Sequence, residues 1–431
     1  MNPIQYLFYM GMSLTTLIEF GILLLFFLIF KCWFAFLILL GFLGFIGFKA
    51  YQYIQLQKLS NRASIFNQDI PKQMHAAYYS NSWKNIINFG EYLVPNKLKG
   101  DELLIKVHSA SLNPVDYKFV TTKLPFYRWI CFPNLGIGYD FSGEVIKTGE
   151  LVTKYRIGDF VFGFACIGVL QEYTITKEKL IHIIPDRVKF QEAASLPLAG
   201  VVSYQALTYF LKNNADNNIY GELGEEPDLT GKNILVVGAT GGCGHIAIQL
   251  AKFLNANQVY GVCSHEKVDL IKSLNICEDV IAYDAIDFQN ALDSALLTED
   301  GQPKIDLILD TVSSPEAGDV GAQYMKYLKI DGNYVCLNSS SYFTWFKGLL
   351  VSFIPKLNLE KKGTHLHLFN KNDYKALDTI CNMVSQGKFH FFTQNFLFDY
   401  QAIDNAIKML KSRKTTGKLV CNIINDENIV I

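Results

Sequence analysis

The sequence lacks paired cysteines, a strong net charge and low-complexity tracts. Its nine cysteines are scattered over 431 residues without one C-x-x-C pair, which excludes a zinc ribbon and a dense disulfide framework. The formal net charge is −1, so there is no global basic field to hold nucleic acid, and we expect no such partner. Half of the residues are hydrophobic and 18% are charged, a composition that excludes disorder. We therefore expect a folded protein with reduced thiols in ordinary packing.

The first fifty residues form a separate, strongly apolar segment. Residues 20–48 carry one charge, Lys31, and residues 1–18 contain no Lys or Arg. This run exceeds the roughly 20 residues that span a bilayer, and it lacks the basic start of a cleaved signal peptide. We predict a retained membrane anchor at 1–51, in contact with membrane lipid. One transmembrane helix fits better than two, because no Gly, Pro or Asn is available for a turn near Lys31.

The residues around this anchor indicate its orientation and its neighbours. The basic residues near it all follow it, at Lys49, Lys58, Arg62 and Lys72. This asymmetry places the large C-terminal part on the cytosolic or matrix side. Glycines at 41, 44 and 47 permit the close approach of another helix. Glycines that face lipid and contact no other helix would give the same pattern. We expect other membrane-protein subunits as partners.

A dinucleotide-binding unit is predicted in the middle of the chain. A β-branched run at 232–238 leads into the glycine turn GATGGCG at 238–244, then a helical pattern at 245–254 and a second strand at 258–263. Strand, glycine turn, helix and strand form the unit that holds a pyrophosphate on a helix start. Further strands are expected at 280–283, 305–310 and 332–337. His245 opens the helix, where it would either contact phosphate or, more commonly, lie on the helix surface.

The end of the second strand indicates the cofactor. NAD sites usually place an acid there for the ribose 2′-hydroxyl. This chain has Cys263, followed by Ser264 and, three residues later, Lys267. A hydroxyl and a cation suit a 2′-phosphate, so we expect NADPH, with Glu266 facing water.

The order of the motifs resembles the medium-chain dehydrogenase/reductase superfamily, in its zinc-free quinone oxidoreductase branch. The long insertion near 339–363 resembles that of the reticulon-interacting mitochondrial protein and the chloroplast-envelope quinone oxidoreductase homologues. The blocks that carry the resemblance to the superfamily, besides the glycine turn, are SLNPVDYK at 111–118, GYDFSG at 138–143, GDFVFG at 158–163, EAASLPLAG at 192–200 and GKLV at 417–420.

The resemblance implies an α/β protein with a GroES-like, β-rich catalytic domain and a Rossmann doubly wound parallel sheet, preceded here by the transmembrane helix. The expected parts after the anchor are a connector at 52–83, the catalytic domain at 84–207, the Rossmann NADPH-binding domain at 208–360 and a C-terminal return to the catalytic domain at 361–431. The active site is expected between the two domains.

The same resemblance assigns site residues. Zinc relatives carry Cys where Asn113 stands and His where Tyr139 stands, so we expect no metal, since a catalytic zinc needs about three protein ligands. Asn113 is expected to bind the substrate carbonyl, or else to cap its loop before Pro114, while Asp116 matches a structural position. The remaining candidates are Tyr117 and Tyr127 as catalytic tyrosines, and Gly241, Gly242, Gly244, Ser264, Lys267, Tyr283, Asn338 and Arg413 as cofactor-binding residues.

Two functions follow. The first is a membrane-anchored oxidoreductase that moves hydride from NADPH to a quinone or enone. The alternative is an accessory subunit of a mitochondrial inner-membrane respiratory complex, such as complex I, with little or no turnover. The anchor and an aromatic insertion at 339–363 favour the alternative. The mitochondrial inner membrane, with the main domain in the matrix, is the expected location, and the endoplasmic reticulum membrane is the second.

Overall fold

The computed structural model describes residues 70–79, 87–95, 97–121, 136–165, 168–213, 227–314, 317–337, 364–366 and 374–424. The chain divides into two units, Met1–Asp69 and Ile70–Ile431, and every described residue belongs to the second. The predicted anchor, Tyr127, Asn338 and the insertion at 339–363 lie outside the described residues. None of the helices in the described ranges is long and apolar enough to cross a membrane.

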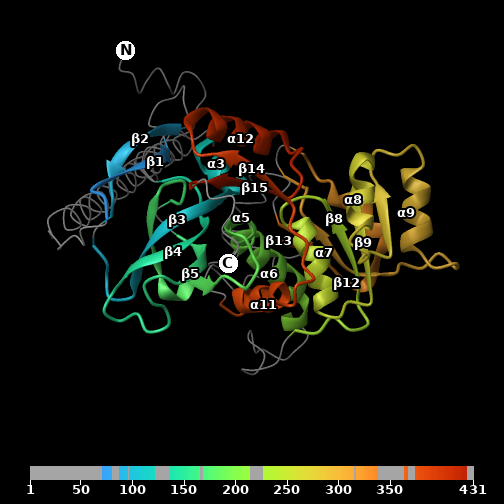
Figure 1. Ribbon diagram of the computed structural model, residues 1–431. Coiled ribbons are helices and arrows are strands. Elements are labelled where there is room, and N and C mark those ends of the chain that lie inside the picture. The colour runs from blue at the N-terminus through green and yellow to red at the C-terminus, as the bar shows by residue number, and fades with distance from the viewer. Residues whose placement is uncertain are drawn as a thin grey trace, which may run out of the picture. The chain divides into compact units, whose positions relative to one another are not determined.

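One half of the second unit is built on a seven-stranded, mainly antiparallel sheet. Its path is β14-β15-β3-β4-β5-β7, and β6 pairs with β3 from outside that path. The strands are β3 (Glu102–Leu112), β4 (Asp140–Thr148), β5 (Phe160–Phe164), β6 (Tyr173–Lys177), β7 (Ile181–Ile183), β14 (Thr393–Leu397) and β15 (Lys418–Asn422). The red strand β15 lies beside the much earlier β3, and β14 lies on the other side of β15 (Figure 1). The C-terminal segment therefore adds two strands to the sheet that holds β3.

The other half is a parallel sheet of six strands in the order β10-β9-β8-β11-β12-β13. With the strands numbered along the chain from the first, this is the 3-2-1-4-5-6 order of a Rossmann fold. They are β8 (Asn233–Val237), β9 (Gln258–Cys263), β10 (Asp279–Ala282), β11 (Ile305–Asp310), β12 (Leu328–Cys336) and β13 (Thr364–Leu366). The predicted strands at 258–263 and 305–310 have the observed bounds, and the helix predicted after the glycine turn is α7 (Gly244–Phe253).

Helices cover these sheets and connect the halves. They are α3 (Pro114–Thr121), α5 (Phe190–Ala194), α6 (Pro197–Asn213), α8 (Val268–Lys272), α9 (Phe288–Leu296), α11 (Tyr374–Ser385) and α12 (Tyr400–Ser412). Figure 1 shows α8 and α9 beside β9 at one end of the parallel sheet, and α12 above β14 and β15. One apolar cluster includes Phe162 from β5, Ile248 from α7 and Ile380 from α11. Burial of this shared core stabilises the two halves as one body.

The observed element bounds differ from the predicted domain limits at three places. A two-stranded antiparallel sheet of β1 (Gln73–Tyr79) and β2 (Ile87–Leu93) begins inside the expected connector. The α6 helix runs across the expected limit at 207/208, and β13 extends the parallel sheet beyond 360. In each case strand pairing or packing with distant segments sets the boundary of the structural part, and the local amino-acid composition carries little information about that boundary.

Candidate active site

The glycine turn between β8 and α7 has the shape that a dinucleotide pyrophosphate requires. Gly238 has a φ of +84°, and the Gly241 N–H donates to the Gly238 carbonyl over 2.9 Å. A Cβ on Gly244 would lie 2.1 Å from that same oxygen, so only glycine fits there. The turn ends at the N-terminus of a ten-residue helix, where free N–H groups and the helix dipole favour a phosphate. Gly241 and Gly244 thus lie in this turn, and their contact with a cofactor stays a prediction.

The C-terminal segment closes over this turn. The Gly417 N–H donates to the Thr240 carbonyl over 2.8 Å, and Gly417 forms a parallel bridge with Gly241. Beyond it the Lys418 side chain passes so close that a Cβ on Gly242 would lie 3.0 Å from Lys418 Cδ. Lys418 therefore starts at the glycine turn, and its ammonium group reaches the catalytic half.

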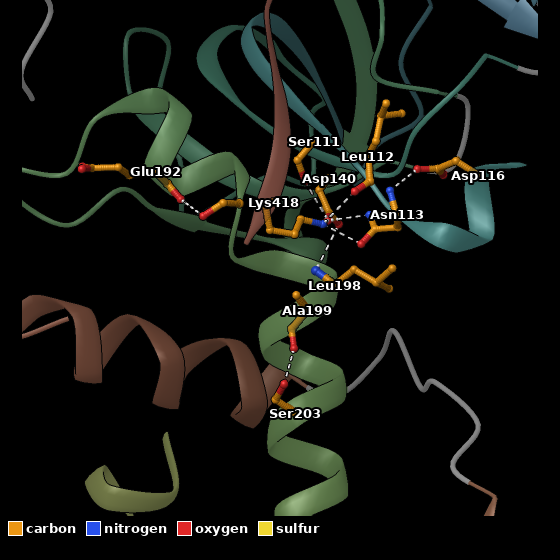
Figure 2. A network of polar contacts seen from close by, with 11 residues as sticks. Ser111, Leu112, Asn113, Asp116, Asp140, Glu192, Leu198, Ala199, Ser203 and Lys418 are labelled. Carbon is orange, nitrogen blue, oxygen red and sulfur yellow. Dashed lines mark hydrogen bonds and ion pairs between the residues drawn. The ribbon is translucent and has the colours of Figure 1, made fainter. Parts of the chain in front are cut away.

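That ammonium group joins a buried polar network around Asn113 (Figure 2). Lys418 Nζ donates to Asn113 Oδ1 at 2.6 Å, to Asp140 Oδ2 at 3.2 Å and to the Leu112 carbonyl at 3.2 Å. Asn113 Nδ2 in turn donates to Asp140 Oδ2 at 2.8 Å. The side chains of Lys418 and Asp140 are 4% and 0% exposed, so this is a desolvated ion pair.

Asp140 connects this network to two further elements. Its Oδ2 also accepts from Ser111 Oγ at 3.2 Å, and its Oδ1 accepts from the Leu198 N–H, at the start of α6, at 3.1 Å. Asp140 lies in the block GYDFSG and Lys418 in the block GKLV, and neither residue was predicted to belong to the site. A charged residue within each block is the signal that could have indicated the pair.

Asp116 lies on the other side of Asn113. Its Oδ2 accepts from the Asn113 backbone N–H at 2.7 Å, and no residue in the described part of the chain bonds its buried Oδ1. Burial, with a smaller contribution from the Asp140 charge, raises the pKa of Asp116 to about 7. The carboxyl group therefore titrates near neutrality. Its bond to Asn113 agrees with the expected structural role.

Tyr117 is buried with the catalytic half's core, 8% exposed. Lys411 Nζ lies 5.7 Å from the centre of its ring, within cation–π range. Its assignment as a catalytic tyrosine stays a prediction.

The predicted adenosine-end residues gather at the carboxyl ends of β9 and β10. Ser264 directly follows β9, and the Tyr283 N–H donates to the Cys263 carbonyl at 2.9 Å. Lys267 Nζ donates to the Lys414 carbonyl at 3.1 Å, which places Lys267 beside the residue that follows Arg413.

Two further observations bear on this end of the site. The Arg413 guanidinium donates to the Val312 carbonyl. Asp284, which sequence reasoning missed, accepts from the His265 N–H at 2.7 Å and adds an acid to the group. Its place directly after Tyr283 is the signal that was available. Glu266 is exposed, as expected.

His245 is not on the helix surface, contrary to the commoner expectation. It is 0% exposed, stacks on Phe392 with ring centres 5.2 Å apart, and its Nδ1 lies 2.9 Å from the Gly241 carbonyl. A carbonyl only accepts, so Nδ1 carries the proton and supports the glycine turn. Burial lowers the pKa of His245 to about 4.

We expect this histidine to make the protein sensitive to acid. Unfolded His245 binds a proton below about pH 6.5, whereas the folded residue resists it down to about pH 4, so stability falls as the pH drops through that window. The loss attributable to His245 should approach about 3 kcal/mol at pH 4. Urea unfolding of wild type and His245→Gln at pH 7 and 4.5 measures it, with the exposed His265→Gln as control. Equal acid sensitivity in all three proteins would contradict this assignment.

Asn113 and Tyr139 stand where zinc-dependent relatives carry metal ligands, so no bound metal is expected. Within the ranges that the structure describes, no group of three or more His, Cys, Asp or Glu side chains is placed to hold a metal ion. Asn113, at one of the two expected ligand positions, is instead committed to the network with Lys418 and Asp140. The absence of zinc remains a prediction.

Known proteins resemble both halves. Family models for the alcohol dehydrogenase GroES-like domain and for zinc-binding dehydrogenase match residues 99–186 and 277–421. A chloroplast envelope quinone oxidoreductase homologue of Arabidopsis thaliana is 33% identical over 74% of this chain and 89% of its own length. The chloroplastic quinone-oxidoreductase homologue of Spinacia oleracea is 36% identical, and the match spans 49% of this chain and 62% of that protein.

Two further relatives extend the comparison. The chloroplastic NADPH-dependent alkenal/one oxidoreductase of A. thaliana is 31% identical over 67% of this chain and 69% of its own length. The solved quinone oxidoreductase of Coxiella burnetii is 29% identical with a TM-score of 0.61, over 82% of this chain and all of that chain. The proteins that this chain resembles are therefore oxidoreductases.

Proposed function

The chain belongs to the medium-chain dehydrogenase/reductase superfamily, and from that premise we propose that it transfers hydride from NADPH to a quinone or an enone. The observation that carries the proposal is the direct link between the two halves of the site. The Lys418 side chain packs on Gly242 of the glycine turn and bonds Asn113, the candidate substrate-binding amide.

The residues of the chain have separate tasks in this proposal. Gly241, Gly242 and Gly244 allow the pyrophosphate to approach the backbone and the start of α7. Bound NADPH supplies the hydride. Asn113 donates a hydrogen bond to the substrate oxygen as negative charge develops there, which lowers the barrier because the donor is already oriented and buried. The tyrosines at 117 and 127 are the candidates for orienting the substrate or donating the proton.

The experiment is a direct assay. Purified protein is mixed with NADPH and, separately, with a benzoquinone or an α,β-unsaturated ketone, and loss of absorbance at the nicotinamide band is followed. We expect turnover with at least one substrate class, and a loss of about a hundredfold in kcat for Asn113→Ala. NADPH binding by calorimetry without turnover of either class would contradict the catalytic proposal.

We propose that NADPH is preferred over NADH. Lys267 follows β9 and donates to the Lys414 carbonyl, next to Arg413, and the relative from A. thaliana is named as NADPH-dependent. NADPH should bind at least tenfold more tightly than NADH, about 1.4 kcal/mol. Titration calorimetry should show that Lys267→Ala weakens NADPH and leaves NADH nearly unchanged, with the exposed Lys408→Ala as control. If Asp284 holds a ribose hydroxyl instead, NADH will bind as well or better, and the preference for NADPH is wrong.

The membrane location is proposed from the sequence alone. Residues 20–48 have the length and apolarity of a transmembrane segment. We propose that they anchor the oxidoreductase domain to an organelle membrane, beside other membrane-protein subunits. The mitochondrial inner membrane is the first candidate and the endoplasmic reticulum membrane the second. The full chain should stay in the pellet after alkaline extraction, whereas a chain without residues 1–50 should be released. Release of both would contradict the anchor.

A further inference from the structure

The side-chain amide of Asn113 is held at both ends by groups of opposite chemistry. On one side, Lys418 Nζ lies 2.6 Å from Asn113 Oδ1. On the other, Asp140 Oδ2 lies 2.8 Å from Asn113 Nδ2. All three residues are buried, with Asn113 at 4% exposed, so water does not compete for these contacts.

This arrangement determines which way the amide points. An ammonium group only donates hydrogen bonds and an ionised carboxylate only accepts them, so Oδ1 must face Lys418 and Nδ2 must face Asp140. A flipped amide would place its NH2 group against the ammonium and its oxygen against the carboxylate. In a buried site each mismatch costs a hydrogen bond and adds repulsion.

The same arrangement leaves one donor for another molecule. An Asn amide has two N–H groups on Nδ2, and within the described part of the chain Asp140 is the acceptor for one of them. The ammonium bond to Oδ1 also draws electron density from the amide, which makes the second N–H a stronger donor.

Lys418 also connects this donor to the cofactor turn. The aliphatic part of the Lys418 side chain lies against Gly242, because a Cβ added to Gly242 would be 3.0 Å from Lys418 Cδ. The position of Lys418 therefore depends on the glycine turn. The register Leu419↔Leu112 between β15 and β3 places the adjacent Lys418 beside Asn113. One side chain thus spans the two parts that hydride transfer must align.

We propose that Lys418 and Asp140 are positioning residues that together lock the Asn113 amide in one orientation, so that its remaining N–H binds the substrate carbonyl oxygen. Lys418 acts through Asn113 and needs no contact with the substrate itself. This inference rests on the proposed function, because it requires Asn113 to be the substrate-binding amide.

A double-mutant cycle tests the inference. Lys418→Met keeps the stem against Gly242 and removes the ammonium group. We expect it to lower kcat at least tenfold while the Kd of NADPH stays within twofold. In an Asn113→Ala background the same change should alter kcat by less than twofold, because there is no amide left to orient. Lys408 is an exposed lysine on α12, and the matched control Lys408→Met should leave kcat unchanged.

A merely structural lysine gives a different result. If Lys418→Met lowers kcat by the same factor in both backgrounds, Lys418 does not act through Asn113 and the inference is overturned. Should Lys418→Met not fold, the Lys418→Met/Asp140→Asn pair removes both charges and keeps an acceptor for Nδ2. It is expected to show the same loss of kcat, and full activity in that pair would also overturn the inference.

A readout without turnover separates this inference from the proposed function. The side-chain amide signals of Asn113, identified in nitrogen-15 spectra by their loss in Asn113→Ala, should shift in Lys418→Met and not in Lys408→Met. If the wild-type protein reduces no quinone or enone, the proposed function fails while the spectra still report the locked amide. Unchanged Asn113 signals in Lys418→Met would contradict the lock itself.

Discussion

Replacing Gly244 with alanine is expected to abolish NADPH binding and to weaken the fold. The new Cβ would lie 2.1 Å from the Gly238 carbonyl oxygen, and 2.8 and 2.9 Å from two further backbone atoms, none of which moves without opening the turn. Overpacking of this kind costs about 1–3 kcal/mol or more. The affinity for NADPH should fall at least a hundredfold, about 2.7 kcal/mol, because the distorted turn withdraws the helix start from the pyrophosphate. Urea unfolding and calorimetry measure the two effects.

Two other glycines serve as controls for this change. Gly90 on β2 has nothing within 4 Å of its ideal Cβ, so Gly90→Ala should alter neither property. Among the described residues, a Cβ on Gly241 would meet the Gly238 oxygen alone, at 3.3 Å. Gly241→Ala should therefore stay folded yet bind NADPH more weakly, since a side chain on this turn hinders the close approach of the pyrophosphate to the backbone. Normal NADPH affinity in both Gly241→Ala and Gly244→Ala would show that the cofactor does not bind at this turn.

Removal of the Asp140 carboxylate is expected to destabilise the protein by about 3–5 kcal/mol. Asp140→Ala deletes the acceptor for Ser111, Asn113, Lys418 and the Leu198 N–H together, and leaves the ammonium of Lys418 buried without its partner. An uncompensated charge in a dry interior is far more costly than the loss of the pair as a whole. Thermal or urea unfolding at pH 7 gives the number.

A double substitution distinguishes the buried charge from lost packing. Lys418→Met/Asp140→Leu leaves no lone charge and should be more stable than Asp140→Ala. The solvent-accessible pair of Lys408 and Asp404 supplies the comparison, because Asp404→Ala should cost far less than Asp140→Ala. If Asp140→Ala and Asp404→Ala cost the same, the Asp140 carboxylate is not desolvated and the network is weaker than its distances indicate.

The features that could be predicted from the sequence are those set by residues close together along the chain. The strands at 258–263 and 305–310 were predicted with their observed bounds, because short β-branched runs between turn signals indicate buried parallel strands. The glycine turn was found for the same reason, since strand, glycines and helix lie within about 30 residues of each other. Ser264 and Tyr283 each directly follow a parallel strand, and those strand ends share one edge of the sheet, while their role at a cofactor stays a prediction.

The buried network was decided only by the tertiary structure. Lys418 and Asp140 are 278 residues apart, and two strand registers bring them together: Leu419↔Leu112 places β15 on β3, and Ser111↔Asp140 places β4 on its other side. His245 looked like a surface residue on its own helix, and it is buried because Phe392 stacks on it from the C-terminal segment. The sequence by itself determined the order of strands, turns and helices and the site of the glycine turn. Which polar side chains are shielded from water, and therefore paired, shifted in pKa or oriented for chemistry, depended on contacts between distant segments that no local pattern encodes.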